Sequence, residues 1–163
     1  MAFFGLGKKK VELLAPFAGE VVALDEVPDP VFSGRMLGDG VALRPAEDAT
    51  VVTVVAPVAG RLVKVFKTGH AFALVTPEGV EVLVHVGLET VERKGEGFDT
   101  IAATGDEVAA GDPVVSVDVA SLRAAGYNLI TPVVFTKRGQ VASVDVHAGV
   151  RSVGETVGTA TLA

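Results

Sequence analysis

Glycine and proline punctuate this chain so densely that they leave little room for long helices. Nineteen glycines and eight prolines are spread over 163 residues, and they separate short runs rich in Val, Ile, Leu and Phe. Short β-branched runs bounded by turn residues are typical of strands, and closely spaced strands indicate a sandwich or barrel. We therefore expect an all-β fold, an antiparallel β-sandwich or barrel with internal pseudo-repeats and at most short helical turns.

The expected strands are the apolar or alternating runs between these turn residues. In 61–67, for example, odd and even positions differ in polarity, as in a strand with one buried face. Two segments are expected to form short helical turns instead: 119–126, with Asp118 as its N-cap, and 98–104. The expected strands are 11–14, 19–24, 40–43, 49–56, 61–67, 71–75, 81–86, 113–117, 132–136 and 140–147.

One segment of the chain echoes another. The sequence APFAGEVVAL at 15–24 recurs as APVAGRLVKV at 56–65. The spacing of such echoes is irregular, which argues against a solenoid and favours repeated turn units within one pseudo-symmetric domain. We expect residues 11–163 to form that single domain. Residues 1–10 are expected to be a flexible N-terminal segment with at most a peripheral membrane association.

Charge and composition exclude several function classes. The net charge is −6 and the pI is about 5.0, which argues against a nucleic-acid partner and permits docking to a basic protein surface. Cysteine is absent, so disulfides, thiolate zinc clusters and cysteine nucleophiles are excluded. The mean hydropathy is +0.49, yet no run approaches the about 20 apolar residues of a spanning helix. The hydropathy therefore indicates a Val-rich core.

The histidine at position 85 lies in an expected strand with two different faces. Alternation places three valines of 81–86 on one face, and Glu81, Leu83 and His85 on the other. The valine face is the core side, so His85 is expected to face outward on a partly apolar surface. Gly87 follows at once and allows the chain to turn or a partner to approach closely.

His70 is expected to be a cross-strand neighbour of His85. A hairpin with a turn centred on Pro77 and Glu78 pairs positions 70 and 85, and paired residues have Cβ atoms roughly 4.5–5.5 Å apart. One neutral imidazole can accept a phosphoryl group while the other donates a hydrogen bond to it. The hydroxyl of Thr68 is placed to fix one tautomer of His70. The alternative, two ordinary surface histidines, stays open on this reasoning alone.

Several stretches of the chain carry a resemblance in the same order. They are 27–32 (VPDPVF), 38–40 (GDG), 68–72 (TGHAF), 79–91 (GVEVLVHVGLETV), 94–98 (KGEGF) and 131–134 (TPVV). Together they resemble the glucose-family enzyme IIA of the bacterial sugar phosphotransferase system, over nearly the whole chain from about Val11. The third histidine, His147, lies outside these motifs and is interpreted as a surface or turn residue.

The resemblance implies a phosphocarrier, and so a phosphotransferase component, in the cytoplasm. His85 would be the phosphorylated residue, with His70 and Thr68 supporting it. It would take its phosphoryl group from phospho-HPr and pass it to the IIB domain of a sugar permease, with regulatory binding to transporters or enzymes. No cofactor is required, although His70 and His85 could hold zinc shared with a partner's carboxylate. The docking residues would be Val31, Phe32, Met36, Leu37, Phe66, Leu83, Val91 and Glu89, where the family often has Asp.

Three other functions were weighed from the residues. A non-catalytic regulatory module acting on transporters or metabolic enzymes is compatible with the same surface. A zinc hydrolase of related β architecture needs a His-x-His pair, and no two of the histidines here are two residues apart. A biotin or lipoate carrier needs a lysine in a matching hairpin context, which Lys137 lacks. The transported sugar is not encoded in these motifs.

Overall fold

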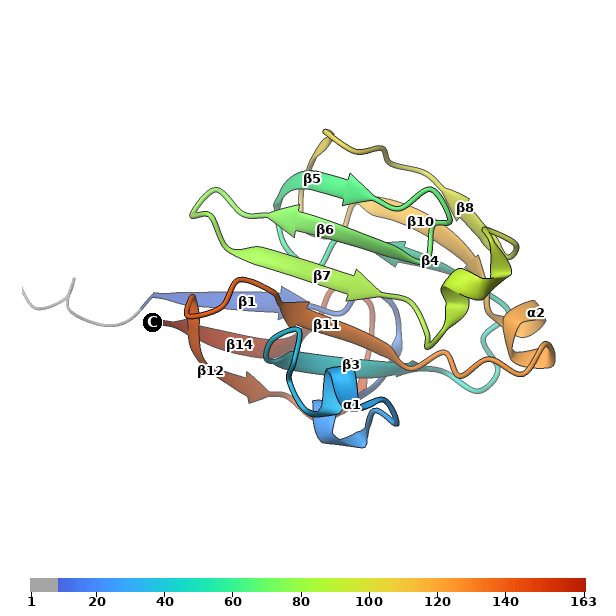
Figure 1. Cartoon of the computed structure of the whole chain (residues 1–163), viewed down its shortest axis with the longest axis horizontal. Coiled ribbons are helices and arrows are strands. Elements are labelled where there is room, and N and C mark those ends of the chain that lie inside the picture. Colours follow the sequence, from blue (N-terminus) through green and yellow to red (C-terminus); the bar gives the residue numbers. More distant parts are fainter. Residues whose placement is uncertain (1–8) are drawn as a thin grey trace, which may run out of the picture.

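Strands dominate the computed structural model, which describes residues 9–163 (Figure 1). All strand pairs in this part of the chain run antiparallel, which confirms the expected fold class. No helix within these residues is long and apolar enough to cross a membrane. In chain order the elements are β1 (Lys10–Leu14), β2 (Gly19–Val22), η2 (Leu24–Glu26), α1 (Pro30–Ser33), β3 (Gly40–Pro45), β4 (Val51–Val55), β5 (Gly60–Val65), β6 (Ala71–Val75), β7 (Glu81–His85), η3 (Thr90–Arg93), β8 (Phe98–Thr100), β9 (Glu107–Val108), β10 (Pro113–Asp118), α2 (Val119–Ala124), β11 (Thr131–Phe135), β12 (Val141–Val146), β13 (Gly149–Arg151) and β14 (Thr156–Leu162).

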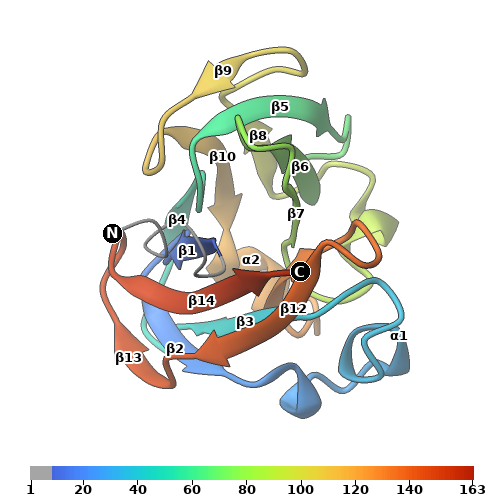
Figure 2. The same ribbon diagram turned by 90° about the vertical axis from the view of Figure 1, so that its left-hand side faces the viewer.

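The strands form one large sheet and two small ones. The large sheet has the order β13-β2-β3-β11-β7-β6-β5-β9, and the small sheets have the orders β1-β14-β12 and β4-β10-β8. Figure 2 shows the large sheet curving from β9 at the top to β13 at the lower left. The site described below lies on β6 and β7, in the middle of this sheet.

Two apolar clusters hold the layers together. The main cluster lies between the sheets and includes the fully buried Leu13, Leu43, Leu62 and Phe72. A smaller cluster lies on the other side of the large sheet, where η2 and α1 cover β3 and β11. Burying each large apolar side chain contributes about 1.5–3 kcal/mol, so both clusters stabilise the sheet on which the site is built.

The internal echo of the sequence corresponds to a pseudo-twofold contact between its two copies. The N–H of Leu14 donates to the carbonyl of Pro57 at 2.9 Å, and the N–H of Val55 donates to the carbonyl of Pro16 at 2.8 Å. Each bond joins the start of one copy to the start of the other. The two copies therefore belong to one domain, as we expected from the sequence.

The N-terminal boundary differs from expectation. Most of the expected flexible segment, 1–10, lies outside the described residues. Lys10, however, pairs with Thr161 as the first residue of β1, and the carbonyl of Lys9 accepts a hydrogen bond from Leu162. These two lysines therefore belong to the folded sheet and not to a free segment.

Several elements were not expected from the sequence. Residues 98–100 form β8, so the helical turn expected over 98–104 is wrong, because β8 pairs with β10 and this pairing outweighs local preference. The strands β9, β13 and β14 and the short helix α1 were not expected either. The second expected helix is confirmed as α2, and the carboxylate of Asp118 caps it by accepting from the N–H of Ser121 at 3.0 Å.

Candidate functional site: a pair of histidines on β6 and β7

β7 presents His85 as its alternating pattern predicts. Val82 and Val84 are completely buried on the core face, whereas Leu83 and His85 are half-buried on the opposite face. Val86 continues the buried face beyond the end of the strand. His85 therefore stands at the last position of a strand that is fixed by its own valines.

The predicted hairpin register is wrong by one residue. His85 pairs with Ala71, not with His70. The loop has three residues instead of two, because Gly79 adopts a φ of +88° and the N–H of Thr76 bonds to the carbonyl of Val80. A turn followed by a left-handed glycine is the usual form of a three-residue hairpin loop, and it shifts the pairing by one position.

His70 nevertheless meets His85, because it lies just outside β6. Gly69, with a φ of +71°, bends the chain there, and the carbonyl of His70 accepts from the N–H of Val86 at 2.7 Å. The two ring centroids are 5.2 Å apart and the ring planes are inclined by 80°. The predicted pairing of the imidazoles is therefore confirmed, although the bend produces it and the strand register does not.

The Nδ1 atom of each histidine is engaged by the protein. Nδ1 of His85 lies 2.7 Å from the carbonyl oxygen of Gly87, which can only accept, so this nitrogen carries the proton. Nδ1 of His70 lies 2.5 Å from the hydroxyl of Thr68, as expected for a residue that fixes its tautomer. Neither Nε2 has a hydrogen-bond partner among residues 9–163, and neither is a buried unpaired atom there. Both Nε2 atoms are therefore open to a ligand.

The electrostatic environment favours neutral rings. Burial lowers the pKa of His85 from its ordinary value of 6.5, and the Gly87 carbonyl and the charge of Asp29 only partly oppose this. Burial also lowers the pKa of His70, and the neighbouring His85 lowers it further. At neutral pH, His85 therefore has a free lone pair on Nε2.

Two phenylalanines form the walls beside the rings. The ring of Phe32 lies 5.3 Å from that of His85, and the ring of Phe66 lies 5.3 Å from that of His70. Phe66 is half-buried, and the ammonium of Lys64 lies 5.6 Å from its centroid. Phe32 is only 5% exposed and belongs to the smaller apolar cluster. Phe32, predicted as a docking residue, is therefore almost fully covered, and its ring packs against that of His85.

Most of the other predicted docking residues are accessible. Val31, Met36 and Leu37 are exposed on and after α1, which carries Phe32 to His85. Val91 is exposed on η3, and Leu83 is half-buried beside His85. Glu89, with a φ of +58°, is also exposed. These side chains are available to a partner around the histidines.

Sequence reasoning missed the role of Gly87. The sequence suggests that a glycine here lets a partner approach, but Gly87 is buried against the protein's own chain and its carbonyl holds the ring of His85. A backbone carbonyl has no residue type of its own, so the sequence carries no signal for it. Asp29, whose charge acts on His85, also caps α1 by accepting from the N–H of Val31 at 2.9 Å.

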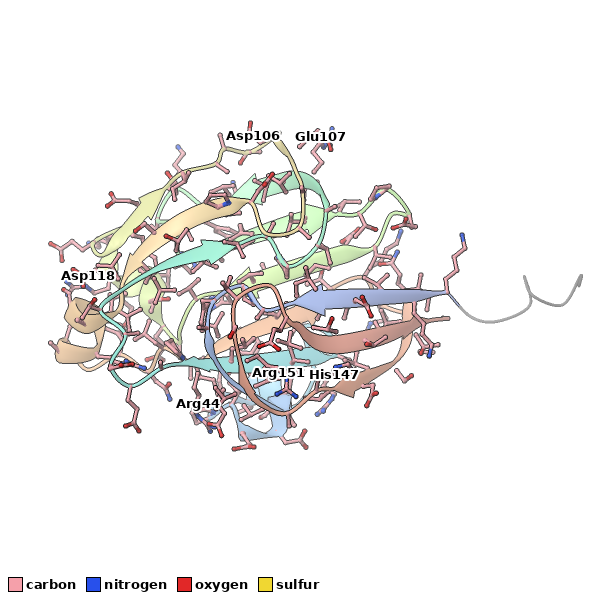
Figure 3. The ribbon with its side chains drawn as sticks, turned by 180° about the vertical axis from the view of Figure 1, so that it is seen from behind. Arg44, Asp106, Glu107, Asp118, His147 and Arg151 are labelled. Carbon is pink, nitrogen blue, oxygen red and sulfur yellow. The ribbon has the colours of Figure 1, made fainter. Side chains whose placement is uncertain are left out.

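The third histidine lies elsewhere. His147 is half-buried between β12 and β13, on the side shown in Figure 3, and its Nε2 is 3.2 Å from the hydroxyl of Thr159. Its interpretation as a surface or turn residue is confirmed. In the part of the chain that the structure describes, no three His, Cys, Asp or Glu side chains gather as a metal site. A metal at His70 and His85 would therefore need a ligand from elsewhere.

A neutral imidazole with an open Nε2, backed by a second histidine in an all-β domain, has the chemistry that a carrier of phosphoryl groups needs. Comparison with known proteins identifies the family to which the chain belongs. Residues 11–141 match the family model of the phosphoenolpyruvate-dependent sugar phosphotransferase system, EIIA 1, and the chain belongs to this family. It is therefore a phosphocarrier component of the sugar phosphotransferase system, as the sequence motifs predicted.

Individual relatives agree with this assignment. The chain is 45% identical to a glucose-specific EIIA component from Bacillus cereus over 149 residues, which are 90% of this chain and 88% of that protein. It is 40% identical to a glucose-specific EIIA component from Staphylococcus aureus over 147 residues, 88% of this chain and 86% of that protein. Among solved structures, glucose permease IIA from Mycoplasma capricolum matches with a TM-score of 0.85 and 40% identity, over 93% of this chain and 96% of that one.

Proposed function

We propose that His85 accepts a phosphoryl group on Nε2 from phospho-HPr and donates it to the IIB domain of a sugar permease. The observation that carries this proposal is the 2.7 Å hydrogen bond from Nδ1 of His85 to the Gly87 carbonyl. That bond holds the proton on Nδ1 and leaves the lone pair on Nε2, where a nucleophile is needed.

The transfer itself is a displacement at phosphorus. The bond from His85 Nε2 to phosphorus forms as the bond from phosphorus to the donor's imidazole nitrogen breaks. The proton on Nδ1 stays on the Gly87 hydrogen bond, which stabilises the positive charge of the phosphorylated ring. No proton has to leave His85 during the step.

His70 acts as the supporting group. When its Nδ1 accepts from the hydroxyl of Thr68, its Nε2 carries the proton and can donate to a phosphoryl oxygen. The two ring centroids are only 5.2 Å apart, so the ring that carries this donor lies next to the ring that accepts the phosphoryl group. Such a fixed donor stabilises the charge that develops on the transferred group.

Docking must position the donor and exclude water from the phosphorylated ring. The exposed apolar side chains of Val31, Met36, Leu37 and Val91 suit this purpose. Asp29 and Glu89 on the same side suit a partner with basic residues, and such charges raise association rates more than affinity.

The site belongs in the cytoplasm, and the same surface is available for regulatory binding to transporters or enzymes. His70 and His85 could hold zinc only when a partner supplies a carboxylate.

The decisive experiment is phosphorylation of the purified chain by phosphoenolpyruvate, enzyme I and HPr, read by intact mass and by site mapping. We expect one acid-labile phosphoryl group on His85. The variant H85A should accept none, whereas H70A and H70Q should accept it and pass it on to a IIB domain poorly. Label on His70 would reverse the assigned roles. A folded wild-type chain that binds HPr but never becomes labelled would favour the regulatory module instead.

A further inference from the structure

The chain turns sharply after His85, and Thr90 closes this turn. The side chain of Thr90 is 0% exposed, and its hydroxyl donates a 2.5 Å hydrogen bond to the carbonyl of Val86. Figure 1 shows β7 running into the yellow-green helical turn that Thr90 begins, beside the orange segment that precedes β11. The hydroxyl therefore ties residues 86–90 into one closed loop directly behind the candidate nucleophile.

Gly87, inside this loop, is held on three sides. A Cβ atom at this position would lie 2.7 Å from Cγ2 of Thr90, 3.1 Å from the carbonyl oxygen of Asn128 and 3.4 Å from Cδ1 of Leu129. The next residue, Leu88, donates its N–H to that same Asn128 carbonyl at 2.9 Å. The Gly87 peptide is therefore confined by its neighbours, and Thr90 makes the closest of these contacts.

Val86 connects Thr90 to both histidines. Its N–H donates to the carbonyl of His70 and its carbonyl accepts from Thr90, so both backbone groups of the residue that follows His85 are anchored. The carbonyl of Gly87, one residue further on, then faces Nδ1 of His85. The direction of that carbonyl depends on the anchor at Val86, which the hydroxyl of Thr90 holds, while Asn128 and Leu129 limit the movement of Gly87 from the other sides.

We propose that Thr90 is a positioning residue that sets the tautomer of His85 through the Gly87 carbonyl. This inference rests on the proposed function of His85. Thr90 touches neither the imidazole nor, by its position, the phosphoryl group. It holds the loop so that the carbonyl accepts from Nδ1, and the lone pair is thereby left on Nε2. At metal-binding histidines, residues that orient the second ring nitrogen commonly matter about 10–100-fold for activity, and we expect a loss at the lower end of this range here.

Loss of the Thr90 hydroxyl should release this control. With the Val86 carbonyl left unpaired, the loop can rotate and the Gly87 carbonyl no longer specifies one tautomer. In the other tautomer the proton is on Nε2, which then has no lone pair to form a bond to phosphorus. A smaller fraction of the molecules then has a lone pair on Nε2 of His85, and the rate of phosphoryl transfer falls.

The test compares T90V, which removes the hydroxyl and keeps the shape, with T90S, which keeps the hydroxyl. The control is T76V, which removes a buried hydroxyl that accepts from the N–H of Val80 at 3.0 Å, at the opposite end of the β6–β7 hairpin. For each unphosphorylated variant, the ¹⁵N shifts of the His85 ring report the tautomer. Single-turnover transfer from phospho-HPr reports the rate.

We expect wild type, T90S and T76V to show a proton on Nδ1, and T90V to show mixed tautomers with transfer slowed about tenfold. A wild-type tautomer in T90V, or mixed tautomers in T90S, would overturn the proposal. If T90V does not fold, T90A, which also lacks the hydroxyl and introduces no larger side chain, takes its place, and a wild-type tautomer in T90A would overturn the proposal in the same way. Failure of wild type to accept phosphate would overturn the proposed function, whereas the tautomer measurement needs no phosphate.

Discussion

Replacement of Phe32 by alanine tests whether this side chain is core or docking surface. Phe32 is 5% exposed, packs with Leu24 and Ile130, and lies against the ring of His85. Removal of a buried phenylalanine costs about 3–5 kcal/mol, and the lower end applies here because α1 has only four residues and can partly close over the cavity. We expect F32A to lose about 3 kcal/mol of unfolding free energy.

The measurement is denaturant unfolding together with a thermal melt. For a chain of this size each kcal/mol shifts Tm by about 2–4 °C, so F32A should melt about 6–12 °C below wild type. The matched control is M36A, which removes a 67% exposed side chain just beyond α1 and should change stability by less than about 0.5 kcal/mol. Because F32A also uncovers the His85 ring, the pKa of His85 should move back toward 6.5.

The two interpretations of Phe32 give opposite results. If F32A keeps the wild-type Tm and the His85 pKa, while transfer from phospho-HPr slows, then Phe32 belongs to the docking surface. Phe32 would then contribute no stability as part of the apolar core. A loss of stability together with a raised pKa of His85 supports its role as a wall of the site.

Three further outcomes follow from the same geometry. If Phe66 belongs to the proposed docking surface, F66E should slow transfer from HPr at least about tenfold while leaving Tm nearly unchanged, because Phe66 is only half-buried; an unchanged second-order rate would remove it from the docking surface. Since burial lowers the pKa of His85 below 6.5, phosphoryl acceptance should be constant above pH 6.5 and decline only below the folded-state pKa, as an NMR titration can check. Stability should fall as the pH drops through 6.5 and level off once it is below the folded-state pKa values, because between these limits the unfolded chain binds protons that the buried rings do not.

The sequence predicts elements best where one face of a strand is strongly apolar. In β7 the buried valines fix which side His85 faces, and no tertiary information is needed. In β14, Gly and Ala alternate with Thr and leave no regular apolar face, and the strand forms because β1 and β12 pair with it on both sides. The same holds for β8, which is three residues long and depends on β10. Pairing across the chain decides such segments, and a local pattern cannot supply it.

The site shows which functional features depend on side-chain chemistry and which depend on backbone geometry. His70, His85 and Thr68 were identified from the sequence because each has a chemistry of its own. What brings them together is the backbone: a left-handed bend at Gly69, a bond from Val86 to the carbonyl of His70, and the carbonyl of Gly87. The hairpin register was wrong by one residue, yet the rings meet, because the bend turns His70 out of the strand alternation. In the proposed function, the reactive nitrogen of His85 is therefore set by a backbone carbonyl whose direction depends on the packing of the loop after β7.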